Sequence, residues 1–180
     1  MNKILYAFAL AGVLGLSSCS DFLDQTSPSE MTAENTYASP YYTNLRVNKL
    51  YGGMAQDRTY AQDLSIVWNL NSDCELIDGL GSNATNTSSE RGNMNYNMDP
   101  GWSKISGVWD AEYGIIEDAN QIIEGIRSSA TLTAGGANQK SMERSLGEAL
   151  TIRAMVYFDL VRIFGDIPFK VEASKSDLGN

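Results

Sequence analysis

The stretch that decides the fold runs from Gly147 to Phe169 and reads GEALTIRAMVYFDLVRIFGDIPF. Its apolar residues recur at steps of three and four, which is the spacing of one face of an α-helix. Gly165 tolerates left-handed geometry at a helix end, and Pro168 prevents the helix from resuming. The pattern therefore predicts an amphipathic helix that ends at Gly165. Its expected buried face comprises Leu146, Ala149, Leu150, Tyr157, Leu160, Val161 and Phe164, widened by Ala154 and Phe158.

The charged residues of this helix are expected at the edge of that face or in solvent. Arg153 is a cation at the margin of the apolar stripe. Arg144 with Glu148, and Asp159 with Arg162, have the spacing of solvated intrahelical ion pairs. Such pairs contribute only a few tenths of a kcal/mol each.

The residue order of the helix, E-A-x-x-x-R-A-x-x-Y-F-D-L-V-R-x-F-G-D-I-P, resembles a helix of the SusD/RagB family of outer-membrane nutrient-binding lipoproteins. The resemblance implies a mainly α fold, in which tetratricopeptide-like helices form a scaffold that carries long irregular loops. No clean 34-residue self-repeat is present, so the repeat assignment follows from the resemblance alone. The matching positions are Glu148, Ala149, Arg153, Ala154, Tyr157, Phe158, Leu160, Arg162, Phe164, Gly165, Asp166 and Pro168.

Two further helices are expected, and a small-residue connector over residues 128–139 joins the second of them, over residues 105–126, to the helix described above. One begins near Ser39 and Pro40 and continues to about Gln56, because serine is a good N-cap and proline suits the first helical turn. Its expected stripe is Tyr42, Leu45, Val47, Leu50, Tyr51 and Met54, with Gly52 and Gly53 allowing close packing at its end.

The other helix spans residues 105–126, and its run G-V-W-D-x-x-Y-x-x-I-x-x-A-N-Q-I-I resembles a second helix of the same family. The acidic residues Glu112, Glu117, Asp118 and Glu124 are expected to lie largely off its apolar face. That face comprises Ile105, Val108, Trp109, Tyr113, Ile116, Ala119, Ile123 and Ile126.

The N-terminus has the organisation of a bacterial lipoprotein. Residues 1–18 combine Lys3 with an apolar run too short for a comfortable membrane span, which is typical of an export signal. The sequence Leu16-Ser17-Ser18-Cys19 resembles a lipobox, so Cys19 is the expected lipidation site, carrying acyl chains such as palmitate. Residues 19–39 are then the lipidated N-terminus and a polar tether, and residues 40–180 the N-terminal part of a helical domain, a fragment incomplete at its C-terminus.

Composition excludes several classes of function. The formal net charge of −9 disfavours nucleic acid, whose binding depends on Lys and Arg neutralising phosphates. The chain has no histidine, which excludes His-based zinc sites, Ser-His-Asp triads and Cys-His dyads within it. If Cys19 is lipidated, Cys74 has no intrachain disulfide partner. Neither a metal nor a cofactor is predicted.

Residues 57–104 do not show the long amphipathic helical pattern of the segments on either side. Residues 64–70 fit either a short strand or a helical turn, and residues 78–101 are rich in Gly, Asn, Ser and Thr without helical periodicity. Long loops of this composition inside compact domains are often functional. A sugar site needs apolar rings and hydrogen-bonding groups together. The candidate ligand residues are Trp68, Asn71, Asp73, Asn93, Tyr96 and Trp102.

Other interpretations compete for this loop. Trp68 and Trp102 are at least as compatible with core packing or loop anchoring as with ligand binding. Asp73 and Glu75, two positions apart, are weak grounds for a glycosidase pair, so no catalytic residue is predicted.

The resemblance implies non-catalytic binding of a nutrient, an oligosaccharide first of all, by a lipid-anchored protein at the surface of the outer membrane. It further implies a SusC-like TonB-dependent transporter as the partner that receives the ligand. The alternative is a structural lipoprotein subunit of a membrane complex with no ligand site of its own.

Overall fold

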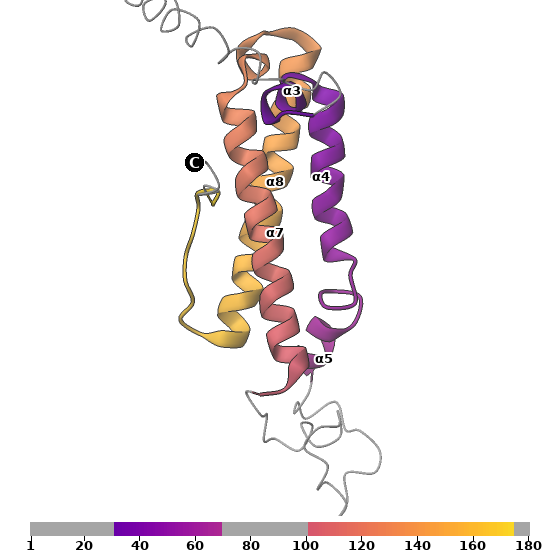
Figure 1. Cartoon of the computed structure of the whole chain (residues 1–180), viewed down its shortest axis with the longest axis vertical. Coiled ribbons are helices and arrows are strands. Elements are labelled where there is room, and N and C mark those ends of the chain that lie inside the picture. The colour runs from indigo at the N-terminus through magenta and orange to yellow at the C-terminus, as the bar shows by residue number, and fades with distance from the viewer. Residues whose placement is uncertain (1–30, 70–100, 175–180) are drawn as a thin grey trace, which may run out of the picture. The chain divides into compact units, whose positions relative to one another are not determined.

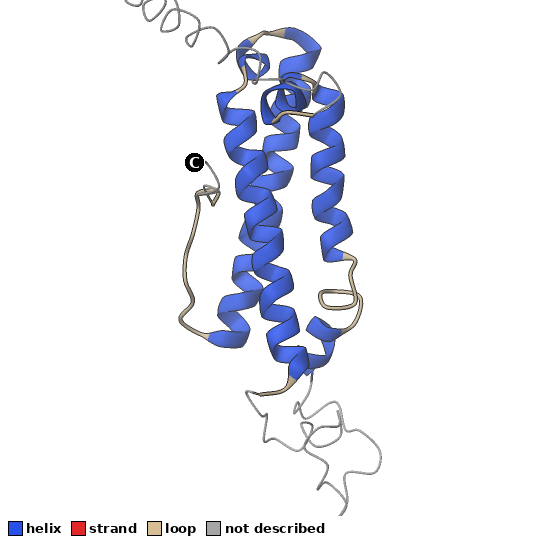
Figure 2. Ribbon diagram, viewed as in Figure 1, coloured by secondary structure: helices blue, strands red, loops and turns tan. Residues whose placement is uncertain are grey.

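The computed structural model describes residues 31–69 and 101–174. The chain divides into two compact units, residues 1–32 and 33–180, and nearly all described residues belong to the second. Regular structure in the described residues is entirely helical, without a strand, so the predicted mainly α fold is confirmed (Figure 2). The elements are α3 (Ala33–Ala38), α4 (Pro40–Met54), α5 (Asp63–Asn69), α7 (Ser103–Ser128), the 3-10 helix η1 (Ala130–Thr133) and α8 (Gly136–Phe164).

The three longest helices form an antiparallel scaffold of the expected tetratricopeptide-like kind. Helices α7 and α8 make a hairpin, and α4 packs against both of them (Figure 1). Helix α3 packs on α4 and α7, while α5 packs on α7. The main core therefore forms where α4, α7 and α8 meet. Its fully buried members are Val47, Leu50, Ala119, Ile122, Ile126, Met142, Ala149, Val156 and Leu160.

The end of α8 follows the sequence prediction. Gly165 caps the helix with φ of 75°, and its N–H donates to the Val161 carbonyl at 2.9 Å. The chain then turns, and residues 166–174 run back beside the hairpin as an extended segment (Figure 1). The start of α8 differs from the prediction, because Gly136 already belongs to the helix although it lies in the expected connector.

Helix α3 was not anticipated. It lies within residues 19–39, for which the sequence predicted only a polar tether. Tyr37 is buried in the main core. The Ser129 and Thr131 hydroxyls donate to the carbonyls of Tyr37 and Ala38 at 2.6 and 2.8 Å. Among residues 31–69 and 101–174, packing on the scaffold thus begins near Ala33 and not at Pro40.

The buried face of α4 is narrower than predicted. Val47 and Leu50 are buried as expected, but Tyr42, Leu45 and Tyr51 are exposed. Thr43 takes a core position instead, and its hydroxyl donates to the Ser39 carbonyl at 2.9 Å. A threonine can occupy this position because a carbonyl of its own helix satisfies its hydroxyl.

The buried face of α8 is likewise displaced from the prediction. Ala154 is exposed, and so are Val161 and Phe158, the latter 61% accessible. Ile152 and Val156, which were not in the predicted face, are buried. The wide apolar surface allowed more than one choice of inward direction, and packing against α4 and α7 selected one.

Two acidic residues contradict the sequence prediction. Glu112 was expected off the apolar face of α7, yet it is fully buried. Asp159 was expected in a solvated pair with Arg162, yet it is only 3% exposed. The pair of Arg144 with Glu148 does form on the surface, with Nε and Oε1 2.9 Å apart.

The undecided stretch at residues 64–70 is helical as far as Asn69, since α5 includes it. Among the described residues, no helix combines the length and the apolar character that crossing a bilayer requires.

Candidate functional site

Most of the predicted ligand residues lie outside the described ranges. Asn71, Asp73, Asn93 and Tyr96 fall in residues 70–100, and the lipidation site Cys19 falls in residues 1–30. Trp68 and Trp102 are described, and they flank residues 70–100 in the sequence. Their surroundings are therefore the part of the predicted site that the structure can locate.

Trp102 is a packing residue. It immediately precedes α7 and is 6% exposed. It forms a second apolar cluster with Leu64 and Val67 of α5 and Val108 of α7. This cluster attaches α5 to the first turns of α7. Trp102 therefore anchors the start of α7 to α5, while its part in ligand binding stays a prediction.

Trp68 lies at the edge of the same cluster. The guanidinium of Arg162 lies 4.9 Å from the centre of its ring. The ring of Tyr60 meets it edge to face, with centroids 6.4 Å apart. One face of the indole is thus already covered by a cation, an arrangement that itself contributes about 0.5–1 kcal/mol. Its buried Nε1 has no hydrogen-bond partner among the described residues.

A polar hollow opens beside α5 and the start of α7, and we call it the α5 hollow. It encloses about 520 Å³. An ion pair crosses its wall, with Lys104 Nζ 2.5 Å from Asp63 Oδ1 and both side chains less than one-fifth exposed. Its lining consists of Arg58, Asp63, Trp102, Ser103, Lys104, Ser106, Gly107 and Asp110.

The chemistry of the α5 hollow suits hydrogen bonding to a polar ligand. Serine hydroxyls can donate and accept, Arg58 donates through a planar fork, and the carboxylate of Asp110 accepts. The hollow brings cations and carboxylates together, so it has no strong preference for ligand charge. Within residues 31–69 and 101–174, no three Asp, Glu or Cys side chains gather as they would around a metal ion.

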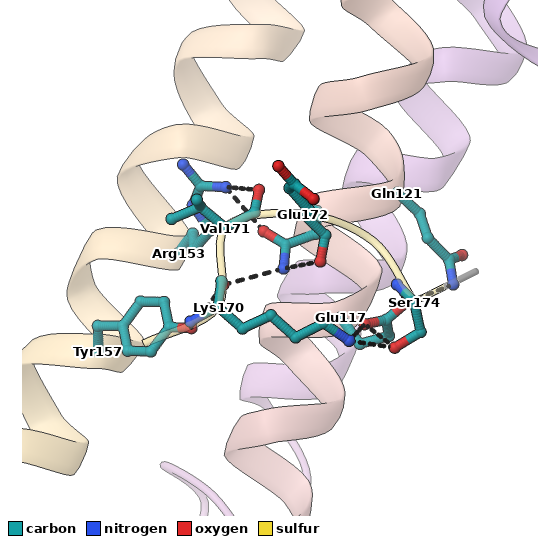
Figure 3. A network of polar contacts seen from close by, with 9 residues as sticks. Glu117, Gln121, Arg153, Tyr157, Lys170, Val171, Glu172 and Ser174 are labelled. Carbon is teal, nitrogen blue, oxygen red and sulfur yellow. Dashed lines mark hydrogen bonds and ion pairs between the residues drawn. The ribbon is translucent and has the colours of Figure 1, made fainter. Parts of the chain in front are cut away.

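A second polar arrangement holds residues 168–174 against the α7–α8 hairpin, and we call it the clasp (Figure 3). Asn120 donates through Nδ2 to the carbonyls of Lys170 and Glu172, at 3.1 and 3.2 Å. Arg153 donates through Nη1 to Asn120 Oδ1 at 2.7 Å and to the Val171 carbonyl at 3.1 Å. The backbone groups of an isolated extended segment are therefore satisfied by side chains of two helices.

Tyrosine hydroxyls complete the backbone contacts of the clasp. The Tyr157 hydroxyl donates to the Lys170 carbonyl at 2.6 Å and accepts from the Lys170 N–H at 2.8 Å. The Tyr113 hydroxyl donates to the Pro168 carbonyl at 2.7 Å. Burial raises the pKa of Tyr113. Tyr113 consequently remains a neutral donor at physiological pH.

Glu117 closes the far end of the clasp. Its carboxylate accepts from the Ser174 N–H at 2.8 Å and from the Gln121 amide at 3.2 Å. Burial alone would raise the pKa of Glu117, but these hydrogen bonds and the charge of Lys170 outweigh burial and lower it. Glu117 is thus an anion that the clasp stabilises.

In the sequence, the residues of the clasp stood out mainly through the resemblance to the SusD/RagB family. Arg153 stood out as a cation beside an apolar stripe, and Tyr113, Asn120 and Tyr157 matched a family pattern. Their shared role was not predicted, because their partners are backbone groups that no residue pattern reveals.

The burial of Glu112, by contrast, had a signal in the sequence, since Glu112 continues the stripe of Val108, Ile115 and Ala119 at helical spacing.

In the described residues the chain is a helical scaffold of α4, α7 and α8 with a clasped segment along the α7–α8 hairpin. The chain belongs to the SusD-like family. The matching family model covers residues 21–179 and is described as SusD-like_3, starch-binding associating with outer membrane. The resemblance found in the sequence is thereby confirmed.

Curated relatives agree with this membership. SusD-like protein P2 of Formosa agariphila is 28% identical over 170 residues, which are 94% of this chain and 31% of the relative. SusD-like protein P25 of the same organism is 23% identical over 180 residues, covering 95% of this chain and 31% of the relative. A SusD-like protein of Bacteroides ovatus is 30% identical over 63 residues, 35% of this chain and 11% of that protein.

The chain thus spans 31% of the length of the two Formosa relatives. No solved structure gives a significant match to it.

Proposed function

We propose that the protein binds a nutrient glycan at the surface of the outer membrane, without chemical change, and passes it to a SusC-like TonB-dependent transporter. The observation that carries the proposal is the match over residues 21–179 to a family described as starch-binding and associated with the outer membrane. In this proposal acyl chains on Cys19 anchor the protein, since multiple chains hold far more firmly than one.

The α5 hollow supports the proposal by its position and chemistry. Its lining includes Asp63 and Trp102, which in the sequence flank the stretch whose Asn71, Asp73, Asn93 and Tyr96 are the proposed ligand residues. Its hydroxyl, guanidinium and carboxylate groups match the rim of a sugar ring. Trp68 and Trp102 would then act as anchors for the loop as well as neighbours of the ligand.

Isothermal titration of the full-length protein against a glycan panel tests the proposal. The panel includes malto-oligosaccharides from starch, other neutral oligosaccharides and acidic ones. Arg58→Ala is expected to weaken binding of the recognised glycan roughly tenfold, because it removes a charged hydrogen-bond donor. Arg58 is exposed, so the variant should fold normally.

Arg127→Ala is the matched control, since Arg127 is an exposed arginine near the opposite end of α7. Equal weakening by both variants would show a general charge effect and contradict a site at the α5 hollow. Binding of no panel glycan, together with co-purification with a transporter, would instead support a structural lipoprotein subunit. Release of shortened glycans would overturn the non-catalytic assignment.

A further inference from the structure

The most unusual side chain in the described residues is Glu112. It is 0% exposed on α7, between that helix and its neighbours. Neither Oε1 nor Oε2 has a hydrogen-bond partner in the structure. A buried carboxyl group without a partner is costly, and an unpaired buried carboxylate costs far more. The side chain therefore favours its neutral, protonated form in the folded chain.

The ionisable groups that face Glu112 increase this preference. Asp159 of α8 is 3% exposed, and its Oδ2 accepts a hydrogen bond from the hydroxyl of Tyr60, in the turn before α5. Two cations of the hairpin have other contacts as well: Arg162 lies over the rings of Trp68 and Phe158 while its charge also favours ionised Asp159, and Lys104 pairs with Asp63 of α5. We call Tyr60, Glu112 and Asp159 the acid seam.

The acid seam separates the two apolar clusters. On α7, Glu112 follows Val108 of the second cluster by one turn and precedes Ile115 and Ile116 of the main core. On α8, Asp159 lies between Val156 of the main core and Ile163, which packs on the second cluster. Tyr60 belongs to the segment that links α4 to α5. Segment 55–69 is therefore joined to α8 at the seam by the hydrogen bond of Tyr60 to Asp159, and to α7 by the ion pair of Asp63 with Lys104.

We propose that the acid seam is a proton-dependent latch, which holds segment 55–69 on the α7–α8 hairpin while Glu112 is protonated and loosens it when the proton is lost. With the proton present, one negative charge at most occupies the seam, on Asp159, where the Tyr60 hydrogen bond and the charge of Arg162 stabilise it. Loss of the proton places a second carboxylate, which has no hydrogen-bond partner, in the same buried region. Separation of segment 55–69 from α8 admits water and relieves that repulsion.

The pH range of the latch follows from the environment of Glu112. Burial, followed by the charge of Asp159, raises the pKa of Glu112 to about 8. Burial also raises the pKa of Asp159, against the opposing effects of Tyr60 and Arg162. In the unfolded chain Glu112 titrates near its ordinary value of about 4.3. The acid seam therefore stabilises the folded chain fully at a pH below that ordinary pKa of Glu112. This stabilisation is lost as the pH rises toward about 8.

The latch has a consequence that does not depend on which ligand the protein binds. Segment 55–69 leads directly into residues 70–100 and carries Arg58 and Asp63 of the α5 hollow. Release of the segment would alter the wall of the hollow. Proton concentration would then regulate the geometry beside the loop, whether or not a glycan is recognised there.

Amide hydrogen exchange of the full chain, corrected for the intrinsic pH dependence of exchange, tests the latch. Between pH 6 and pH 8.5, protection of residues 59–69 is expected to fall about tenfold or more in the wild type. Protection of the main core around Ile122 should change much less. In Glu112→Gln the amide carries no titrating proton, so protection of residues 59–69 should become nearly independent of pH.

Two further variants make the result specific. Glu124→Gln removes an exposed carboxylate from the same helix and should behave as the wild type. Asp159→Asn removes a neighbouring charge that raises the pKa of Glu112, so the loss of protection should be smaller and should be complete at a lower pH. The titration of the Glu112 carboxyl carbon, followed by NMR, reports the proton directly and does not depend on how stable each variant is.

The proposal predicts that this carbon titrates well above pH 6. Titration near pH 4 would overturn it, and so would an unchanged pH dependence of exchange in Glu112→Gln. Loss of protection that spreads equally over all helices would also contradict a latch, because it would mean global unfolding. Absence of glycan binding in the calorimetric experiment would leave each of these outcomes unaffected.

Discussion

The two halves of α7 each bury a polar side chain, but only one of these two side chains has hydrogen-bond partners among the described residues. In the C-terminal half, Asn120 is 1% exposed, yet both its amide nitrogen and its oxygen have partners in the clasp. In the N-terminal half, Glu112 is as deeply buried but neither of its oxygens has a partner. The two residues lie on the same helix and both face α8.

The difference lies in the groups that pack against each of these two residues of α7. Asn120 faces residues 168–174, an extended segment whose free carbonyls need donors. Glu112 faces another acidic residue, Asp159, whose one hydrogen bond comes from Tyr60. A buried polar residue therefore stabilises or strains a helical scaffold according to the partner that the fold supplies.

The strongest way to test this comparison is Glu112→Met. Removing the unpaired carboxyl should raise the free energy of unfolding by about 3 kcal/mol at pH 8, where the folded chain must otherwise hold a proton or a buried charge. At pH 5 the gain should shrink to about 1 kcal/mol, since the unfolded chain is then also partly protonated. Urea denaturation at both pH values measures the difference. A loss of stability at pH 8 would mean that Glu112 has a partner there.

Asn120→Ala should act in the opposite direction. It removes the donor to the carbonyls of Lys170 and Glu172 and deprives Arg153 of the Asn120 Oδ1 acceptor, so a loss of about 2 to 3 kcal/mol is expected. Limited proteolysis should cut within residues 166–174 faster than in the wild type. Asn48→Ala is the control, because that amide is exposed on α4 and bonds only to Asn44. A loss as small as the control's would show that the clasp adds no stability.

A smaller effect is expected at the close contact of α3 with the C-terminal half of α7. A Cβ atom at Gly125 would lie 2.1 Å from the ring of Tyr37, so Gly125→Ala should displace the ring. Overpacking of this kind costs about 2 kcal/mol. Thermal unfolding measures it, with Gly114→Ala as the control on the same helix. Nothing lies within 4 Å of a Cβ at Gly114.

The control should raise stability by about 0.5 to 1 kcal/mol, because alanine is the better helix former. Equal effects of the two substitutions would show that Tyr37 does not pack on α7.

The smallest effect concerns the exposed pair of Arg144 and Glu148 on α8. Arg144→Ala should change the free energy of unfolding by about 0.3 kcal/mol, and added salt should reduce the change further. Urea denaturation measures this small change in the free energy of unfolding, which serves as a reference for the larger changes expected in the acid seam and the clasp. A loss above 1 kcal/mol would mean that this surface is packed against something.

Much of the fold could be predicted from local patterns. The end of α8 at Gly165, the start of α4 at Pro40 and the extent of α7 were all expected, because caps and periodicity are properties of neighbouring residues. The family could also be recognised from the order of residues in α7 and α8, and the family match confirms it.

The candidate site was predicted less completely. Trp68 and Trp102 were identified as important, but their roles as anchors depend on Leu64, Val67 and Arg162. The predicted ligand residues between Asn71 and Tyr96, and the lipidation of Cys19, stay predictions.

The sequence by itself determined that this chain is a mainly helical member of the SusD-like family, because periodicity, caps and residue order are readable along the chain. Only the tertiary structure decided which side of each helix faces inward. An apolar stripe wider than one neighbour permits several orientations, and the contacts of α4, α7 and α8 select one. That selection buried Glu112 and Asp159, exposed Phe158, and gave Asn120 its partners. The contrast between Glu112 in the acid seam and Asn120 in the clasp follows from these long-range contacts.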